Sequence, residues 1–312
     1  MYLTCHELFL INMIKIIKMI KIIKDIAKEL IFSIQNLFFK KKLLSEDSFK
    51  INNIIIYGPY SMIRNYRTNP LIIKIIRDRT HVIINEIFSN KNKIKLDVIN
   101  IYDVGANIGL YSIAYSQIPK SRIFSFEPFP ETYRYLEKNK NLNNLNNLNT
   151  YSVGLMDQEK YITMGSPMEN YKGFVDWIRT QGNKIESGCK TIYHDSDNDD
   201  LIKCKFISGD NFFKQNKIQK LHYLKIDTEG SEYLVLQGMK ETLTLMKPII
   251  QLEINTKLMN NVGLDINELK DLLINLGYKK YRLFGETQLN EKSINQLSTS
   301  SLYGSKDYVF FG

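Results

Sequence analysis

The sequence predicts an α/β fold whose central sheet is mostly parallel, doubly wound and covered by helices on both faces. Short apolar runs alternate with helical patterns through the middle of the chain, and a glycine-bearing turn follows the first of those runs. Two aromatic-rich runs near the end, separated by polar residues, indicate an antiparallel hairpin with a long connection. With 312 residues, 44% of them hydrophobic, the chain can bury a substantial core.

The main domain is expected to span residues 98–312, with its elements in regular order. The parallel strands are predicted at 98–104, 122–126, 150–155, 221–226 and 248–254. The helices are predicted at 110–117, 130–142, 232–245 and 266–276, and the antiparallel tail at 278–284 and 308–311. The asparagine- and leucine-rich run 139–149 is too short for a repeat architecture, so we interpret it as a helix end and a loop.

Residues 49–97 are interpreted as a preamble to that domain. Apolar runs at 54–57 and 71–76 are separated by Gly58-Pro59 and Asn69-Pro70, which break regular structure. We expect a short strand or turn and then a helix from about 70 to 88, because proline suits the first position of a helix.

Residues 1–48 are predicted to form a basic, amphipathic helical extension. Residues 7–39 have the composition of a long helix in which lysine recurs at every third position from 15 to 24. Each of those lysines would cost about 3 kcal/mol at the centre of a bilayer, so a transmembrane span is not expected. Lysines spaced by three wind around a helix. Peripheral contact with an anionic membrane, a partner-binding helix and a helix packed on its own domain all stay open.

The formal charge of +9 is concentrated near the start of the chain. We interpret it as solubility together with a coding bias toward Lys, Asn and Ile, rather than as a nucleic-acid surface. The cysteines Cys5, Cys189 and Cys204 form no C-x-x-C pair, so neither a disulfide framework nor a zinc site is predicted. A reducing compartment such as the cytoplasm is therefore expected.

Residues 165–205 show no clear period, and they contain Trp177 and an acidic run at 194–200. We expect an inserted loop or lid after the third strand, because long loops in compact domains are usually functional or disordered. A histidine on such a loop, His194, could act as a base but is more simply solvated.

The most informative local pattern is Asp103-Val104-Gly105-Ala106-Asn107-Ile108-Gly109, at the first turn from strand to helix. A carboxylate at the end of the strand can accept hydrogen bonds from a ligand. Gly105 lets the backbone approach that ligand closely, and Gly109 allows tight packing at the start of the helix.

A second acidic residue, Glu127, follows the second strand 24 residues after Asp103, where a carboxylate can bind ribose hydroxyls. That spacing also occurs in dinucleotide-binding proteins, so it does not separate nicotinamide from an adenosyl ligand. The turn does separate them, because a dinucleotide turn has a second glycine where this chain has Asn107. The chain also lacks a Tyr-x-x-x-Lys pair.

A third pattern, Lys225-Ile226-Asp227-Thr228-Glu229-Gly230, ends the fourth predicted parallel strand. Ligands of open α/β sheets bind outside the carboxyl ends of the strands, so these carboxylates are expected to face the first turn. A helix-capping role for Asp227 or Thr228 is the alternative.

In this order, these motifs resemble the FkbM-type methyltransferases. The resemblance also includes Phe126-Glu127-Pro128-Phe129-Pro130, the spacing of Leu136 and Asn139, Leu236-Gln237-Gly238 and the strand that ends near Glu253, so it covers roughly residues 98–256. It implies a Rossmann-like, seven-stranded methyltransferase sheet with S-adenosylmethionine as methyl donor. It further implies O-methylation of acceptors such as sugars, lipopolysaccharide or polyketide-like compounds.

The resemblance also implies roles for individual residues. Asp103, Gly105 and Asn107, with Gly109 at the helix start, would hold the methionine end of the donor. Glu127 would hold the ribose, and Asp157 would approach the adenine.

Asp227, and after it Glu229, would lie where the methyl group is delivered and serve as base. A divalent metal bound by these two carboxylates and Glu253 is chemically reasonable, because hard oxygen ligands suit magnesium. His222 opens a strand and is expected at the opposite end of the sheet.

The first hypothesis is therefore an O-methyltransferase acting on a sugar, a glycan or another small hydroxylated molecule. Methylation of RNA or protein is the second, and nucleic acid ranks low because no acceptor motif accompanies the fourth strand. A catalytically silent adenosylmethionine-fold module, tethered by its N-terminal helix, is the third. The sequence does not predict an oligomeric state.

Overall fold

The computed structural model describes residues 46–51, 53–59, 62–64, 67, 72–90, 98–164, 202–218, 220–256, 259, 265–286, 290–297 and 306–312. The helix predicted at 7–39 and most of the predicted lid, 165–201, lie outside these residues. No helix within the described ranges has the length and apolarity that crossing a bilayer requires.

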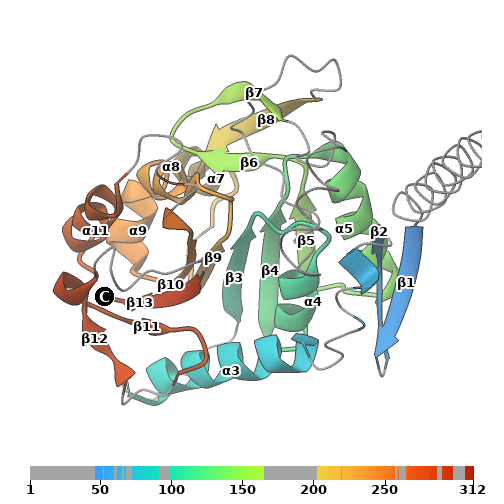
Figure 1. Ribbon diagram of the computed structural model, residues 1–312, viewed down its shortest axis with the longest axis horizontal. Helices are drawn as coiled ribbons and strands as arrows, with labels where there is room; N and C mark the ends of the chain where they lie inside the picture. Colours follow the sequence, from blue (N-terminus) through green and yellow to red (C-terminus); the bar gives the residue numbers. More distant parts are fainter. Residues whose placement is uncertain are drawn as a thin grey trace, which may run out of the picture.

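The centre of the molecule is an eight-stranded sheet in the order β12-β11-β13-β10-β9-β3-β4-β5 (Figure 1). The parallel strands are β3 (Ile99–Val104), β4 (Ser121–Phe126), β5 (Leu148–Tyr151), β9 (Tyr223–Ile226) and β10 (Ile249–Ile254). The antiparallel ones are β11 (Lys280–Leu283), β12 (Lys292–Ser293) and β13 (Lys306–Phe311). The predicted doubly wound sheet with an antiparallel tail is confirmed, with the two-residue β12 added to the seven expected strands.

Helices cover both faces of this sheet. One face packs against α3 (Ile72–Asn90), α4 (Leu110–Ser116) and α5 (Pro130–Leu142). The other face packs against α7 (Gly209–Gln215), α8 (Glu232–Gln237), α9 (Lys240–Met246) and α11 (Ile266–Asn275). Successive strand residues point to opposite faces, so each strand contributes to both cores.

The prediction of one strand over 150–155 is wrong, because this segment belongs to two strands, β5 and β6. The chain leaves the main sheet after β5 and forms β6 (Gly154–Met156), which belongs to a second sheet in the order β6-β8-β7. β7 (Lys160–Met164) and β8 (Ile202–Ser208) complete it, so residues 202–205 of the predicted lid form a strand. Gly154 allows this packing, because a Cβ there would lie 2.2 Å from the ring of Phe206.

The predicted helix 232–245 is also two elements, α8 and α9. The break lies at Gly238, where a Cβ would approach the carbonyl oxygen of Met156 to 1.7 Å. Close contact between the end of α8 and β6 therefore requires glycine, a residue that also weakens a continuous helix.

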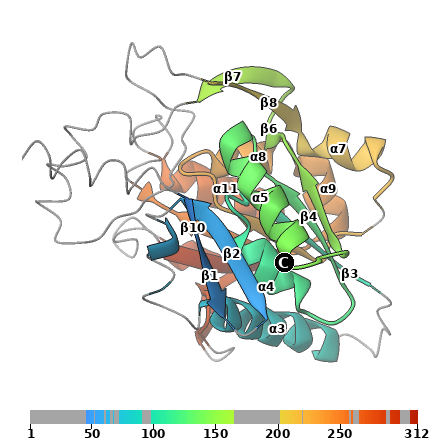
Figure 2. The same cartoon turned by 90° about the vertical axis from the view of Figure 1, so that its right-hand side faces the viewer.

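A hairpin of β1 (Glu46–Ile51) and β2 (Ile54–Pro59) lies along α5, beside the main sheet (Figure 2). The side-chain amides of Asn139 and Asn143 each bond both the N–H and the C=O of one β2 residue, Tyr57 and Ile55 respectively. Asn139 also donates to the carbonyl of Ile108 at 2.8 Å, so it connects the hairpin to the first loop of the site. The predicted boundary between residues 48 and 49 falls inside β1.

Candidate active site

A cavity opens at the carboxyl ends of the parallel strands, beneath the β6-β8-β7 sheet. It brings together residues from three loops and the small sheet: Val104, Gly105, Asn107, Glu127, Pro128, Thr132, Gly154, Leu155, Met164, Phe206, Asp227, Thr228, Glu229 and Ser231. The acidic side has Glu127, Asp227 and Glu229, and the small sheet supplies an apolar wall. Most of the residues predicted for the site thus line one cavity.

The loop after β3 touches the loop after β9 at Gly105. Its φ is +77°, and a Cβ there would lie 1.8 Å from the backbone carbonyl oxygen of Asp227. Gly109, with φ +94°, starts α4 in the left-handed region, and a Cβ there would lie 2.7 Å from Leu136. Any side chain at Gly105 would push the two loops apart.

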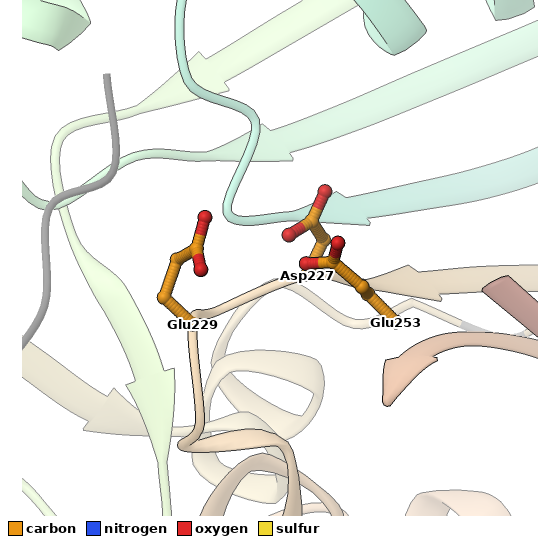
Figure 3. Close-up of side chains that lie close together, drawn as sticks. All are labelled: Asp227, Glu229 and Glu253. Carbon is orange, nitrogen blue, oxygen red and sulfur yellow. The ribbon is translucent and has the colours of Figure 1, made fainter. Parts of the chain in front are cut away.

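The candidate base Asp227 lies close to Glu229, which also lines the cavity, and to Glu253 at the end of β10 (Figure 3). One carboxylate oxygen from each of the three lies within 4.8 Å of the others. Burial acts to raise the pKa of Asp227, but the charge of Lys225 and hydrogen bonds with Glu253 and Lys225 lower that pKa below its ordinary value. A carboxylate at this position can accept a hydrogen bond from a ligand.

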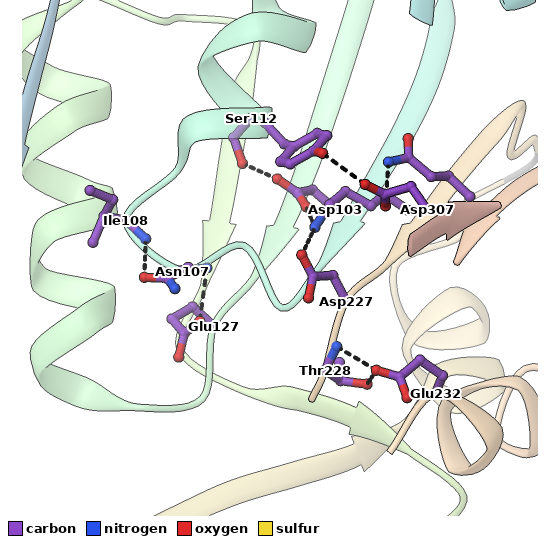
Figure 4. Close-up of polar contacts among 12 residues, drawn as sticks. Asp103, Asn107, Ile108, Ser112, Glu127, Asp227, Thr228, Glu232 and Asp307 are labelled. Carbon is purple, nitrogen blue, oxygen red and sulfur yellow. Dashed lines mark hydrogen bonds and ion pairs between the residues drawn. The ribbon is translucent and has the colours of Figure 1, made fainter. Parts of the chain in front are cut away.

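The carboxylate of Glu127 is held by two backbone amides. One oxygen accepts from the N–H of Asn107 at 2.9 Å, and the other accepts from the N–H of Phe129 at 3.0 Å. Asn107 has φ +52°, and its own side chain accepts from the N–H of Ile108 (Figure 4). The two amides fix this carboxylate at the wall of the cavity, and carboxylate oxygens are acceptors that suit ligand hydroxyls.

Asp103, which the prediction has at the methionine end of the donor, is not among the residues that line the cavity. It is fully buried, and one oxygen accepts from the hydroxyl of Ser112 at 2.6 Å. The other oxygen lies 3.5 Å from the ammonium of Lys225. Asp103 therefore supports the site from behind, and a direct contact with the donor stays a prediction.

Asp103 belongs to a buried polar row that crosses four strands. The β-pairings place Ser125 beside Asp103, Asp103 beside Lys225, and Lys225 beside Gln251. All four are at most 2% exposed. Gln251 accepts from the hydroxyl of Tyr223 at 2.6 Å and donates to Asp307 at 2.9 Å, so the row is extended by hydrogen bonds.

The sequence interpretation included Lys225 in a motif but gave it no role, and it did not single out Glu232. Glu232, 2% exposed, accepts from the N–H of Thr228 and from the N–H of Gly230, and so fixes the turn in which Glu229 has φ +54°. Burial raises the pKa of Glu232. The available signals were a lone cation inside an apolar strand and a carboxylate at the first position of a helix, where acidic residues are favoured.

Two other predicted residues are placed outside the cavity. Asp157 is exposed at the end of β6, and its carboxylate lies 3.6 Å from the ammonium of Lys160, while Gly154 and Leu155 of β6 line the cavity instead. The prediction that Asp157 approaches an adenine gains no support from this position. His222 lies at the amino ends of the strands, as expected, where it accepts from the N–H of Asn100.

The strand order, the glycine turn after β3 and the acidic residue after β4 define the class of S-adenosylmethionine-dependent methyltransferases. Residues 103–280 match the model of the methyltransferase FkbM domain. Because this match covers more than half of the chain, the protein belongs to the FkbM methyltransferase family.

Curated relatives are distant. The hexuronic acid methyltransferase AglP of Haloferax volcanii is 27% identical over 150 residues, which make up 48% of this chain and 54% of the relative. The methyltransferase sdnD of Sordaria araneosa is 26% identical over 45% of this chain and 60% of its own length. The AMB antimetabolite synthetase AmbE of Pseudomonas aeruginosa is 24% identical over 64% of this chain. The chain spans between a tenth and about 60% of the length of these relatives.

Solved structures with partial similarity include the methyltransferase FkbM of Methylobacillus flagellatus, 14% identical with a TM-score of 0.42 over 69% of this chain and 44% of that one. TYW2 of M. jannaschii in complex with AdoMet is 15% identical, with a TM-score of 0.38 over 85% of this chain and 84% of that one.

Proposed function

We propose that this methyltransferase transfers the methyl group of S-adenosylmethionine to a hydroxyl oxygen of a sugar, a glycan or another small hydroxylated acceptor. The observation that carries the proposal is the position of the Asp227 carboxylate in the cavity, next to the loop that contains Gly105. A carboxylate can accept the hydrogen bond of an acceptor hydroxyl and orient its lone pair. The relative named as a hexuronic acid methyltransferase adds support for a carbohydrate acceptor.

Methyl transfer to a hydroxyl oxygen does not require a strong base. The acceptor oxygen attacks the methyl carbon, the carbon–sulfur bond breaks, and its electron pair stays on sulfur to give S-adenosylhomocysteine. As the new oxygen–carbon bond forms, the acceptor oxygen gains positive charge and the proton that it carries becomes strongly acidic. Even a carboxylate with a lowered pKa can therefore take that proton. Most of the acceleration then comes from positioning the two reactants and excluding water.

The donor is proposed to lie with its ribose hydroxyls on the carboxylate of Glu127, which lines the cavity, and its sulfonium toward Asp227. Gly105 and Asn107 would follow the methionine end, since their backbone forms the loop between these two carboxylates. The apolar wall that includes Leu155 and Phe206 would contact the adenine in place of Asp157.

The test is methyl transfer from labelled S-adenosylmethionine to parallel samples of neutral glycans, uronic-acid glycans, lipids, RNA and protein from a lysate. We expect label on a glycan or lipid fraction, and Asp227→Asn should reduce the rate at saturating donor by about 10²- to 10⁴-fold, with donor binding weakened but still measurable. Label confined to RNA or protein would overturn the proposal in favour of those acceptors. Donor binding without transfer to any sample would instead favour a silent module.

The carboxylates of Asp227, Glu229 and Glu253 are close enough to hold a divalent metal, but the proposed reaction does not use one. Hard oxygen ligands suit magnesium, but Asp227 already accepts a hydrogen bond from the Lys225 ammonium at 3.0 Å. We therefore expect methyl transfer to continue in EDTA. A loss of activity that added magnesium restores would instead make the cluster a metal site.

A further inference from the structure

Lys225 is enclosed at the centre of the site although nothing in the reaction described so far uses it. The other three residues of β9 are apolar or aromatic and buried, and Lys225 itself is 2% exposed. Its ammonium lies 3.0 Å from Asp227, 3.5 Å from Asp103 and 4.4 Å from the centre of the Tyr111 ring. Burying an ammonium costs free energy, so a lysine here needs these partners.

The two carboxylates differ in a way that bears on the role of Lys225. Asp103 lies behind the cavity and already accepts a hydrogen bond from Ser112, whereas Asp227 lines the cavity. The shorter contact of Lys225 goes to Asp227. A lysine that only balanced the charge of Asp103 would have no need of that contact.

The geometry points to Lys225 as a positioning residue for methyl transfer, whose ammonium connects Asp103, near the end of β3, to Asp227 and holds the Asp227 carboxylate toward the donor sulfonium. The close approach of Gly105 to the Asp227 backbone fixes the main chain of the loop after β9, and Lys225 fixes the side chain of Asp227. This inference rests on donor binding in the cavity and not on the identity of the acceptor.

Lys225→Met alone is a poor test, because it leaves Asp103 buried without a cation and is expected to destabilise the fold. The double variant Lys225→Met with Asp103→Asn removes both charges, and an asparagine oxygen can still accept from Ser112. The matched control is Asp103→Asn alone, so the comparison isolates the ammonium.

The experiment is calorimetric titration of both variants with S-adenosylmethionine and with S-adenosylhomocysteine, alongside thermal unfolding. We expect the double variant to bind S-adenosylmethionine about tenfold more weakly than Asp103→Asn does, which is the size of one charge-assisted hydrogen bond. The affinity for S-adenosylhomocysteine should change much less, since its sulfur is uncharged and offers no sulfonium for Asp227 to face. Counting charge alone predicts the reverse, because the double variant is more negative by one charge.

Equal or tighter binding of S-adenosylmethionine by the double variant would overturn the inference and leave Lys225 as a charge balance for Asp103. Equal weakening of both ligands would also overturn it, because a packing defect acts on both alike. Neither titration uses an acceptor, so failure of the proposed O-methylation leaves this test intact.

Discussion

The two faces of the central sheet differ sharply in composition, although the same strands form both. Toward α7, α8, α9 and α11, strands β3, β4 and β9 present only apolar and aromatic residues: Tyr102, Val104, Phe124, Phe126, Leu224 and Ile226. Toward α4, the same strands present Asp103, Ser125 and Lys225 near their carboxyl ends. Both faces pack an apolar core, but only the face toward α4 also carries buried polar groups that support the cavity.

The largest expected effect is on stability, and it compares Leu224 and Lys225, two neighbouring residues of β9 that point to opposite faces of the sheet. Leu224→Ala should lower the free energy of unfolding by about 2–5 kcal/mol, because it opens a cavity in a fully buried apolar core. The charge-neutral pair of changes at Lys225 and Asp103 should cost much less stability, since buried ion pairs are often replaced at little cost. Denaturant unfolding measures both, and a larger loss for the polar pair would contradict this division.

Next in size is the contact between the two loops. Gly105→Ala should weaken S-adenosylmethionine binding by about 100-fold, because a methyl group there both strains the backbone and collides with the Asp227 carbonyl. Calorimetry measures the affinity, and circular dichroism shows whether the fold persists. Unchanged affinity in a folded variant would mean that the donor does not use this junction.

A smaller effect is expected at Glu127. Glu127→Gln leaves one of two backbone amides facing an NH₂ group instead of an oxygen, so we expect donor affinity to fall about tenfold. Adenosine is a useful control ligand, because the ribose interaction should account for the loss with both ligands. An effect on S-adenosylmethionine alone would move Glu127 from the ribose to the methionine end.

The smallest effect is expected where charge is exposed. Hydrogen bonds from Tyr57 and Arg134 lower the pKa of Glu46 from 4.5 to about 2. A carboxyl group whose pKa is lowered by folding stabilises the protein at any pH above the pKa that it has in the unfolded chain. For Glu46, that contribution is lost as the pH falls from about 4.5 toward 2. Glu46→Gln should therefore reduce stability slightly at pH 7 and less at pH 3, because exposed pairs are screened. A difference that grows toward low pH would show the opposite linkage.

The sequence was sufficient for features that depend on local pattern. Gly105, Glu127 and Asp227 follow directly after strands, and the carboxyl ends of parallel strands share one edge, so their convergence could be predicted. The β6 break could not, because the apolar run 150–155 does not reveal that Gly154 must fit beneath Phe206, about 50 residues later in the chain.

The orientation of individual side chains was also out of reach. Asp103 faces inward because Ser112 and Lys225 bind it, and those partners lie on a helix and on a strand that is distant in sequence. Lys225 was part of a recognised motif, but its role depends on the strand order that places it between β3 and β10.

The most direct measurement is a crystal structure of the protein with S-adenosylhomocysteine. The account predicts the ribose on Glu127, the methionine portion along the Gly105 loop, and the sulfur next to Asp227, whose carboxylate stays bound to Lys225. A nucleoside bound elsewhere, or one whose sulfur points away from Asp227, would contradict it.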